Sequence, residues 1–265
     1  MSTVAKLFGV EGQVAFVTGA ASGLGLAATE ALARAGAHVA MADIDAEGLE
    51  REAARLLDEG LRVSTHELDV ADGPRIHRVV DEVARQHGRL DMCFANAGVT
   101  SGPSYAMSPE GKLANLSPER WEANLRVNLT GAWETVRAAA APMQRQRSGS
   151  VVVTASISGM KASPVSGYPY VAAKAALINL VRHAAVELGE DNVRVNAIAP
   201  GVIVTNIAGG AMRDPARANS MAETIPLRRV GQPMEVGGVV LFLLSPASSY
   251  VTGTLLPIDG GMTAA

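Results

Sequence analysis

The sequence predicts an α/β fold in which a parallel sheet of seven strands is covered by helices on both faces. Apolar runs of strand length alternate with helical stretches along the whole chain, an order that requires βαβ crossovers. A glycine-rich turn follows the first apolar run directly, and polar motifs recur where later strands end. Ligands of such sheets bind outside the carboxyl ends of the strands. Together these observations indicate a doubly wound parallel seven-stranded sheet with a ligand site at that edge.

The elements are expected in strict alternation. We expect strands at 13–18, 37–43, 62–67, 90–95, 149–155, 192–198 and 254–257. We expect helices at 23–35, 45–58, 73–87, 117–146, 168–188 and 233–245. This order is that of a Rossmann-type three-layer sandwich. Because no linker or low-complexity segment interrupts it, residues 1–265 are predicted to form one domain.

Two long connections break the alternation. The first, at 99–118, is rich in Ser, Gly and Pro, and the second, at 202–226, carries Ile207, Met212 and Met221 among polar residues. Compact domains keep most connections short, and long ones at a ligand edge are usually binding loops or lids. The second connection is therefore predicted to be a mobile cover over the substrate.

Composition limits the environment and the partners. The chain has 265 residues and a net charge of −3, with no basic block of the kind that neutralises nucleic-acid phosphates or an anionic membrane. Cys93 is the single cysteine and lies in an apolar run, so it is predicted to be inert core in a reducing compartment. We find no leader pattern and no apolar run of eighteen residues, so we expect a cytoplasmic protein without membrane spans. No metal site is expected.

The glycine turn at 19–25 has the spacing Gly-x-x-x-Gly-x-Gly between a predicted strand and a predicted helix. Glycines let the backbone approach a phosphate, and the helix N-terminus offers free N–H groups and a partial positive charge. Asp43 ends the second strand eighteen residues after Gly25, where a carboxylate that binds the adenosine ribose is expected. Asp45 fits the role of helix cap better, which leaves Asp43 for the ribose. A carboxylate there would repel the 2′-phosphate of NADP, so NAD is the predicted cofactor.

Tyr170 and Lys174 lie four residues apart on a predicted helix and therefore share one face. A nearby ammonium group favours phenolate over phenol, which would lower the tyrosine pKa from about 10 and make it a usable acid or base. Tyr168 has Ala172 at the same spacing and so lacks a basic partner. The pair at 170 and 174 is thus a candidate proton-transfer dyad.

These motifs, in this order, resemble the short-chain dehydrogenase/reductase family over nearly the whole chain. The resemblance rests on residues 18–25, Asp69-Val70, Asn96-Ala97-Gly98, Asn128, a serine near 156, Tyr170-x-x-x-Lys174, Asn196, Pro200-Gly201, 251–253 and 259–261. Ala95 stands where many members have a second asparagine. The resemblance implies an enzyme that moves hydride between a nicotinamide and a CH–OH group.

The resemblance also implies the roles of the site residues. Tyr170 would be the acid and base, Lys174 would lower its pKa and bind the nicotinamide ribose, and Asn128 would kink its helix and hold a water. The implied catalytic set is Asn128, Ser156, Tyr170 and Lys174. The implied cofactor set is Gly19, Ser22, Gly23, Leu24, Gly25, Asp43, Ile44, Asp69, Val70, Asn96, Gly98, Tyr170, Lys174, Pro200, Gly201, Ile203 and Thr205.

Three points stay open at this level. Ser156 and Ser158 both follow a strand at the right distance from Tyr170, although the family pattern favours Ser156. The apolar helix at 168–188 predicts a homo-oligomer, dimer or tetramer, because the sheet can cover only one of its faces. The expected substrate is a neutral secondary alcohol or ketone, cyclic or aromatic, facing Met160, Tyr168, Ile207 and Met212. The alternatives are a 3-oxoacyl-carrier reductase and a non-catalytic dinucleotide-binding regulatory protein.

Overall fold

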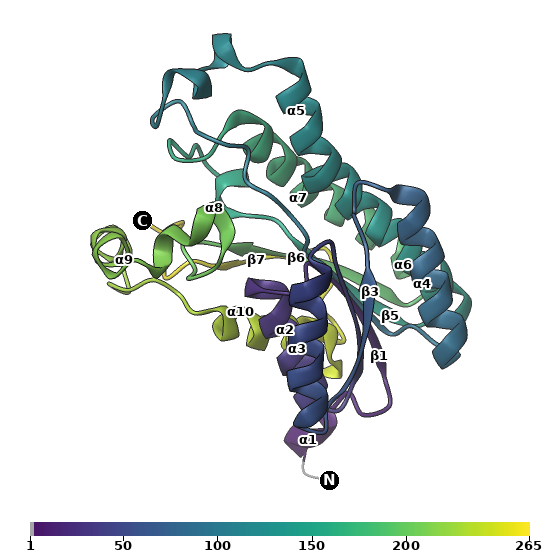
Figure 1. The fold of residues 1–265 in the computed structure, drawn as a ribbon. Helices are drawn as coiled ribbons and strands as arrows, with labels where there is room; N and C mark the ends of the chain where they lie inside the picture. The colour runs from purple at the N-terminus through teal and green to yellow at the C-terminus, as the bar shows by residue number, and fades with distance from the viewer. Residues whose placement is uncertain (1–2) are drawn as a thin grey trace.

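The computed structural model describes residues 3–265, apart from the side chains at 5, 207 and 208. Seven parallel strands form one sheet in the order β3-β2-β1-β4-β5-β6-β7, which confirms the predicted fold class (Figure 1). The strands are β1 (Val14–Thr18), β2 (His38–Asp43), β3 (Arg62–Glu67), β4 (Met92–Ala95), β5 (Gly149–Thr154), β6 (Val193–Pro200) and β7 (Leu255–Ile258).

The strand order reverses next to β1. This strand pairs with β2 on one side, with Thr18 opposite Ala42, and with β4 on the other, with Val17 opposite Phe94. The chain leaves β3 at one edge and returns to the middle of the sheet as β4, so the connections after β1 and β4 diverge to opposite faces. Such a switch point opens a crevice at the carboxyl ends of the strands.

Two helical layers cover the sheet. One contains α2 (Gly23–Arg34), α3 (Ala46–Asp58) and α10 (Pro233–Leu244), and the other contains α4 (Gly73–His87), α6 (Ala132–Gln146) and α7 (Tyr168–Gly189) (Figure 1). A short α1 (Thr3–Phe8), which the sequence pattern does not predict, precedes β1. No described helix combines the length and the hydropathy of a bilayer-spanning segment.

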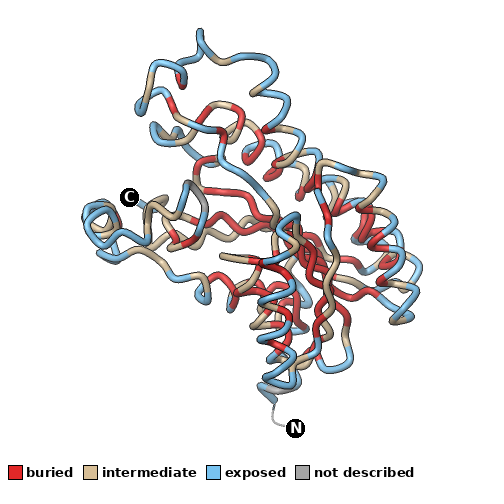
Figure 2. The backbone as a smooth tube through the Cα atoms, viewed as in Figure 1, coloured by how far each residue is buried: buried red, intermediate tan, exposed pale blue. Residues whose placement is uncertain are grey.

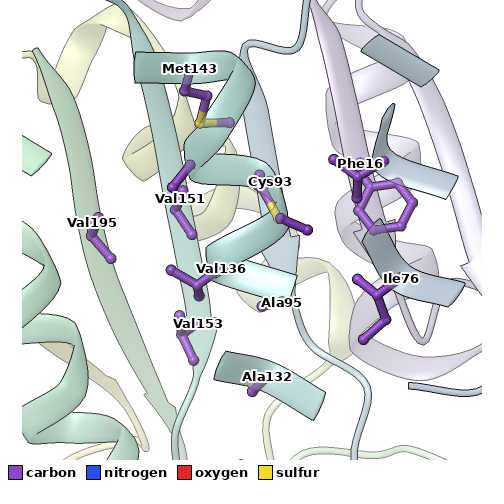
Figure 3. Close-up of a cluster of buried hydrophobic side chains, with 14 of the residues drawn as sticks. Phe16, Ile76, Cys93, Ala95, Ala132, Val136, Met143, Val151, Val153 and Val195 are labelled. Carbon is purple, nitrogen blue, oxygen red and sulfur yellow. The ribbon is translucent and has the colours of Figure 1, made fainter. Parts of the chain in front are cut away.

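The sheet separates two apolar cores. Phe16 on β1 and Cys93 on β4 pack with α4 and α6 on one face (Figure 3), whereas Val17 and Phe94 pack with α2 and α10 on the other. Successive side chains of a strand point to opposite faces, so each strand supplies both cores. The free thiol of Cys93 is fully buried, and burial raises its pKa to about 12, as expected for inert core.

The helix predicted at 117–146 is not continuous. It divides into α5 (Pro118–Leu125), the π-helical segment η3 (Arg126–Gly131) and α6. Within η3 the Asn128 side chain donates to the Asn124 carbonyl, one turn earlier, at 3.2 Å. A Cβ at Gly131 would lie 2.6 Å from the Val70 carbonyl, so this glycine lets the helix approach the loop after β3.

Both long connections contain short helical turns that the sequence pattern does not predict. The first holds η1 (Pro109–Gly111) and η2 (Leu113–Asn115), and the second holds α8 (Ile207–Gly210), η5 (Ala211–Arg213) and α9 (Pro215–Ala222). No residue of α9 is buried. Figure 2 shows both connections mostly in the colour of exposed backbone, in contrast to the sheet.

Candidate active site

A cavity of about 630 Å³ opens at the carboxyl ends of the central strands. Its size lies within the range of small-molecule and cofactor sites, about 300–1,000 Å³. All but one of the predicted site residues line it: Gly19, Ser22, Gly23, Leu24, Asp43, Ile44, Asp69, Val70, Asn96, Gly98, Asn128, Ser156, Tyr170, Lys174, Pro200, Gly201, Ile203 and Thr205. The structure thus brings together residues that the sequence spreads over nearly two hundred positions.

Gly25 is the predicted residue that does not line the cavity. A Cβ at this position would lie 2.0 Å from the Gly19 carbonyl oxygen, so glycine lets α2 pack onto the turn below the ligand surface. Gly19 and Gly23 have φ values of +70° and +56°, a backbone region that side chains disfavour. In this structure Gly25 closes the turn, and its contact with the cofactor stays a prediction.

Asp43 is held at the rim of the cavity by two backbone amides. Its Oδ2 accepts a hydrogen bond from Ala21 N at 2.9 Å and its Oδ1 accepts one from Asp45 N at 3.1 Å. Asp45 caps α3 by accepting from Gly48 N at 3.0 Å, as predicted. Each Asp43 oxygen retains lone pairs directed elsewhere, so this carboxylate can accept from two ribose hydroxyls. The glycine turn and this oriented acid fit an adenosine diphosphate moiety.

Asn96 lines the cavity but also joins three strands. Its Nδ2 donates to the Thr18 carbonyl at 3.1 Å, its Oδ1 accepts from Thr154 Oγ1 at 3.0 Å, and its backbone N donates to Thr18 Oγ1 at 3.0 Å. The predicted cofactor role did not anticipate this structural one. The bonds fix the ends of β1, β4 and β5 relative to each other, and with them the floor of the cavity.

The two candidate serines have different surroundings. Ser156 is buried at the end of β5, and its side chain hydrogen-bonds Tyr170 and accepts from Ser158 N at 3.1 Å. The Ser158 hydroxyl instead meets the Ser166 hydroxyl at 3.0 Å, and Ser158 does not line the cavity. Only Ser156 of this pair is in contact with Tyr170 within the cavity.

Lys174 lies beside Tyr170, although not as a direct ion pair. Its Nζ is 5.6 Å from the centroid of the Tyr170 ring and donates to the Thr154 carbonyl at 2.7 Å. Burial lowers the pKa of Lys174 to about 8. Burial also raises the pKa of Tyr170, against a lowering by its hydrogen bond to Ser156. Burial therefore dominates the pKa of Tyr170 in this structure, and the expected lowering by Lys174 stays a prediction.

Asn128 is fully buried and connects η3 with the segment that follows β4. Its Oδ1 accepts from Val99 N at 3.2 Å, and its Nδ2 donates to the Val99 carbonyl at 2.9 Å. A Cβ at Gly98 would lie 2.8 Å from that Oδ1 and 3.6 Å from Lys174 Nζ, so only glycine leaves this approach open. The predicted distortion of the helix at Asn128 is present.

The remaining predicted cofactor residues lie at the two ends of the cavity. Asp69 and Val70 follow β3, and Asp69 Oδ1 accepts from Ala71 N at 2.8 Å. Ile203 forms an isolated parallel bridge with Gly231, which anchors the start of the second long connection. Thr205 lies next to Gly23, since a Cβ on that glycine would meet the threonine methyl at 3.5 Å.

The sequence did not point to two residues of the site. Thr154, the last residue of β5, supplies the carbonyl that holds Lys174, and its position directly before Ala155-Ser156 was the available signal. A Cβ at Gly159 would lie 2.6 Å from the Lys174 backbone carbon, so this glycine allows the loop after β5 to pack on α7. No sequence pattern indicates that contact.

The residues expected to face a substrate lie outside this cavity. Met160 is 41% exposed, and neither it nor Tyr168 nor Met212 lines the cavity. The side chain at 207 lies outside the described residues. Lys161 donates to the Met262 carbonyl. Among the described residues, no group of three or more His, Cys, Asp or Glu side chains is placed to hold a metal ion.

Fold and cavity together define an α/β protein with a site that fits a dinucleotide and is lined by Tyr170 and Lys174, and comparison with known proteins narrows this class. A family model described as enoyl-(acyl carrier protein) reductase matches residues 19–263. The chain belongs to the short-chain dehydrogenase/reductase family, as its motifs predicted. Members of this family are oxidoreductases that bind a nicotinamide dinucleotide.

Three similar proteins each cover 96% of this chain. The 3-oxoacyl-(acyl-carrier-protein) reductase FabG of Thermotoga maritima is 38% identical over 255 residues, 96% of this chain and 98% of the relative. A cyclohexanol dehydrogenase of Rhodococcus sp. (strain TK6) is 37% identical over 268 residues, 96% and 97% of the two chains. The solved structure of levodione reductase has a TM-score of 0.89 at 34% identity, covering 96% of this chain and 99% of its own.

Proposed function

We propose that this protein is an NAD-dependent oxidoreductase that interconverts a neutral secondary alcohol and its ketone. The carrying observation is the single cavity that is lined by Asp43, by Lys174 and by the Ser156–Tyr170 pair. A relative that oxidises a cyclic secondary alcohol by its printed name, cyclohexanol dehydrogenase, supports the substrate class.

Bound nicotinamide would supply the hydride acceptor or donor, and the protein would supply the cradle, the orientation and the proton. Asp43 would accept from the ribose hydroxyls, and its charge would disfavour a 2′-phosphate. Lys174, which is held in place by the Thr154 carbonyl, would bind the nicotinamide ribose. Gly98, Pro200 and Gly201 would let the backbone approach the rings of the cofactor.

At the substrate end, Ser156 would hold the reacting oxygen and Tyr170 would exchange the proton with it. Ser156 Oγ already accepts from Ser158 N, so its own proton is free to be directed towards Tyr170 or the substrate. Burial raises the pKa of Tyr170 and so favours its neutral phenol. The positive charge of oxidised nicotinamide, added to that of Lys174, would favour phenolate. Proton abstraction by Tyr170 would thus depend on the bound cofactor.

We also propose that the protein is a homo-oligomer, dimer or tetramer, assembled through α6 and α7. Trp133 on α6 is 41% exposed and Val186 on α7 is 80% exposed. The exposed side of α7, which the sequence pattern predicts to be apolar, also carries Arg182 and His183. A mixed surface of this kind suits a subunit interface with charged groups near its rim.

A second candidate is reduction of 3-oxoacyl thioesters. It is favoured by the FabG relative and by the description of the matching family model. This candidate differs from the first in its substrate. Such a reductase would normally use NADP, which the Asp43 carboxylate disfavours. A non-catalytic regulatory role would require that the protein bind a dinucleotide and show no turnover, although Tyr170 and Lys174 are both present.

Steady-state assays distinguish these candidates. Purified protein would be tested with cyclic, aromatic and linear secondary alcohols and their ketones, and with an acetoacetyl thioester, each with NAD and with NADP in the matching redox state. Turnover of an alcohol–ketone pair with NAD supports the proposal. A preference for the thioester with NADPH supports the second candidate, and binding of dinucleotide without any turnover supports the regulatory role.

A further inference from the structure

The Arg120 guanidinium makes an unusual set of contacts with the connection that follows β4. Its Nε donates to the Ser101 carbonyl at 2.8 Å, its Nη2 to the Pro103 carbonyl at 2.8 Å and its Nη1 to the Glu110 carbonyl at 3.0 Å. All three nitrogens of one side chain on α5 therefore bind one segment, residues 101–111.

The guanidinium also fits closely against the backbone of this segment. A Cβ at Gly102, where φ is +76°, would lie 2.9 Å from Arg120 Nη2. At the base of the side chain, Ser117 caps α5 by accepting from Arg120 N at 3.3 Å. Arg120 is thus held both at its backbone and at its guanidinium. Three hydrogen bonds to separate carbonyls fit the planar fork of arginine and not the single ammonium of lysine.

Apolar burial does not hold segment 101–111 in place. Its buried side chains are the polar Ser101 and Ser104, whereas Tyr105 is 43% exposed and Met107 is 67% exposed. This is the reverse of the usual distribution. Ser104 contributes local order, because its carbonyl accepts from the N–H groups of residues 107 and 108 at 3.1 and 3.2 Å. Hydrogen bonds, with Arg120 at their centre, therefore fix this segment.

The segment adjoins the catalytic end of the cavity. It continues directly from Val99 and Thr100, which line the cavity, and Val99 is bound on both backbone groups by Asn128. The ring of Tyr105 lies 6.0 Å from that of Tyr168, centroid to centroid, in the first turn of the helix that carries Tyr170. A Cβ at Gly167 would lie 2.1 Å from Ser101 Oγ, so the segment is seated closely on that turn.

We propose that Arg120 is a positioning residue that holds segment 101–111 as a wall of the substrate site beyond Val99 and Thr100. The Tyr105–Tyr168 pair, which lies outside the lining of the cavity, would form the outer part of this wall against the apolar part of the substrate. This inference rests on the proposed function. All three nitrogens of the Arg120 guanidinium already donate hydrogen bonds to backbone carbonyls. The wall therefore presents aromatic side chains to the substrate, and not the charge of Arg120. Such a wall favours an uncharged substituent on the reacting carbon.

The test compares Arg120→Met with Arg120→Lys and with Arg85→Met, a matched control at an exposed arginine on α4. For each variant, kcat and KM are measured with the best neutral alcohol, together with NAD affinity by titration, thermal unfolding and amide hydrogen exchange. Arg120→Met should raise KM about tenfold, leave the NAD dissociation constant within about twofold, and speed exchange in 101–111 only. Arg120→Lys should lie between, and Arg85→Met should resemble the wild type.

The outcomes separate this inference from the proposed function. Absence of wild-type turnover with any alcohol or ketone would refute the proposed function, whereas the inference is judged on the ratio of variant to wild type. An unchanged KM in Arg120→Met overturns the inference. A rise in KM with an equal loss of NAD affinity also overturns it, because Arg120 would then support the whole domain. Full rescue by lysine would show that charge alone, and not the three-pronged geometry, matters.

Discussion

The cofactor end and the substrate end of the cavity are built in different ways. At the cofactor end, strand ends position each polar group, as when two backbone amides hold Asp43 and the Thr154 carbonyl holds Lys174. At the substrate end, two long connections carry short helices, and no residue of α9 is buried. The difference indicates that strand ends build the cofactor end, whereas exposed connections, which vary most readily among related proteins, build the substrate end; movement of these connections on binding stays a prediction.

The largest expected effect is at Tyr170, where the two ends meet. Tyr170→Phe removes the phenolic proton and keeps the ring, so turnover should fall about 10²- to 10⁴-fold with little change in NAD affinity. Steady-state kinetics and NAD titration measure the two effects, with Tyr250→Phe at a fully exposed position as control. A variant that keeps most of its turnover would exclude Tyr170 as the acid–base.

The next effect concerns the stability cost of burying Lys174 in the fixed frame. Its folded pKa of about 8 lies below the usual 10.5, so the unfolded chain holds this proton more tightly between those pH values. Stability should therefore rise with pH across this window, relative to Lys174→Met, which lacks the group. From pH 7 to 10.5, the unfolding free energy of the wild type should rise by about 3 kcal/mol relative to that of Lys174→Met. Denaturant unfolding of cofactor-free protein measures it, and a pH-independent difference would contradict it.

A smaller effect is expected for cofactor choice. NAD should be preferred over NADP by about tenfold or more in kcat/KM, since one repulsive charge at the 2′ position is worth about 1.4 kcal/mol. Asp43→Asn should reduce that preference. Asp45→Asn removes a neighbouring charge but keeps a helix-capping side chain, so it should not alter the preference. Equal efficiency of the wild type with both cofactors would refute this prediction.

The smallest expected effect tests the substrate end of the cavity. If the connection at 202–226 is a mobile cover, amide exchange in 205–222 should slow several-fold when NAD and a substrate analogue are added, with the central strands unchanged. The exposed α9 supports this expectation. Strong protection already present without ligand would show a fixed surface, and the proposed difference in mobility between the two ends of the cavity would then be refuted.

The sequence was most informative where function requires a particular residue at a particular spacing. The strands, the glycine turn, Asp43 and the Tyr170–Lys174 pair are local patterns, and the structure places them as expected. It was least informative where the outcome depends on contacts between distant segments. The helix break at η3 depends on the contact of Asn128 with Val99, and the raised pKa of Tyr170 depends on burial. The hydrogen bonds of Arg120 go to backbone carbonyls, which every residue type carries, so no sequence pattern reveals them.

The two separate cores have a consequence for how the molecule can change. Phe16 and Val17 are neighbours in β1, yet their side chains pack into different cores on opposite faces of the sheet. Conservative changes at these two positions should add in unfolding free energy to within about 0.5 kcal/mol, despite their adjacency. Repacking libraries for the two faces of the sheet could then be selected apart and recombined, and natural drift on one face would need no compensation on the other.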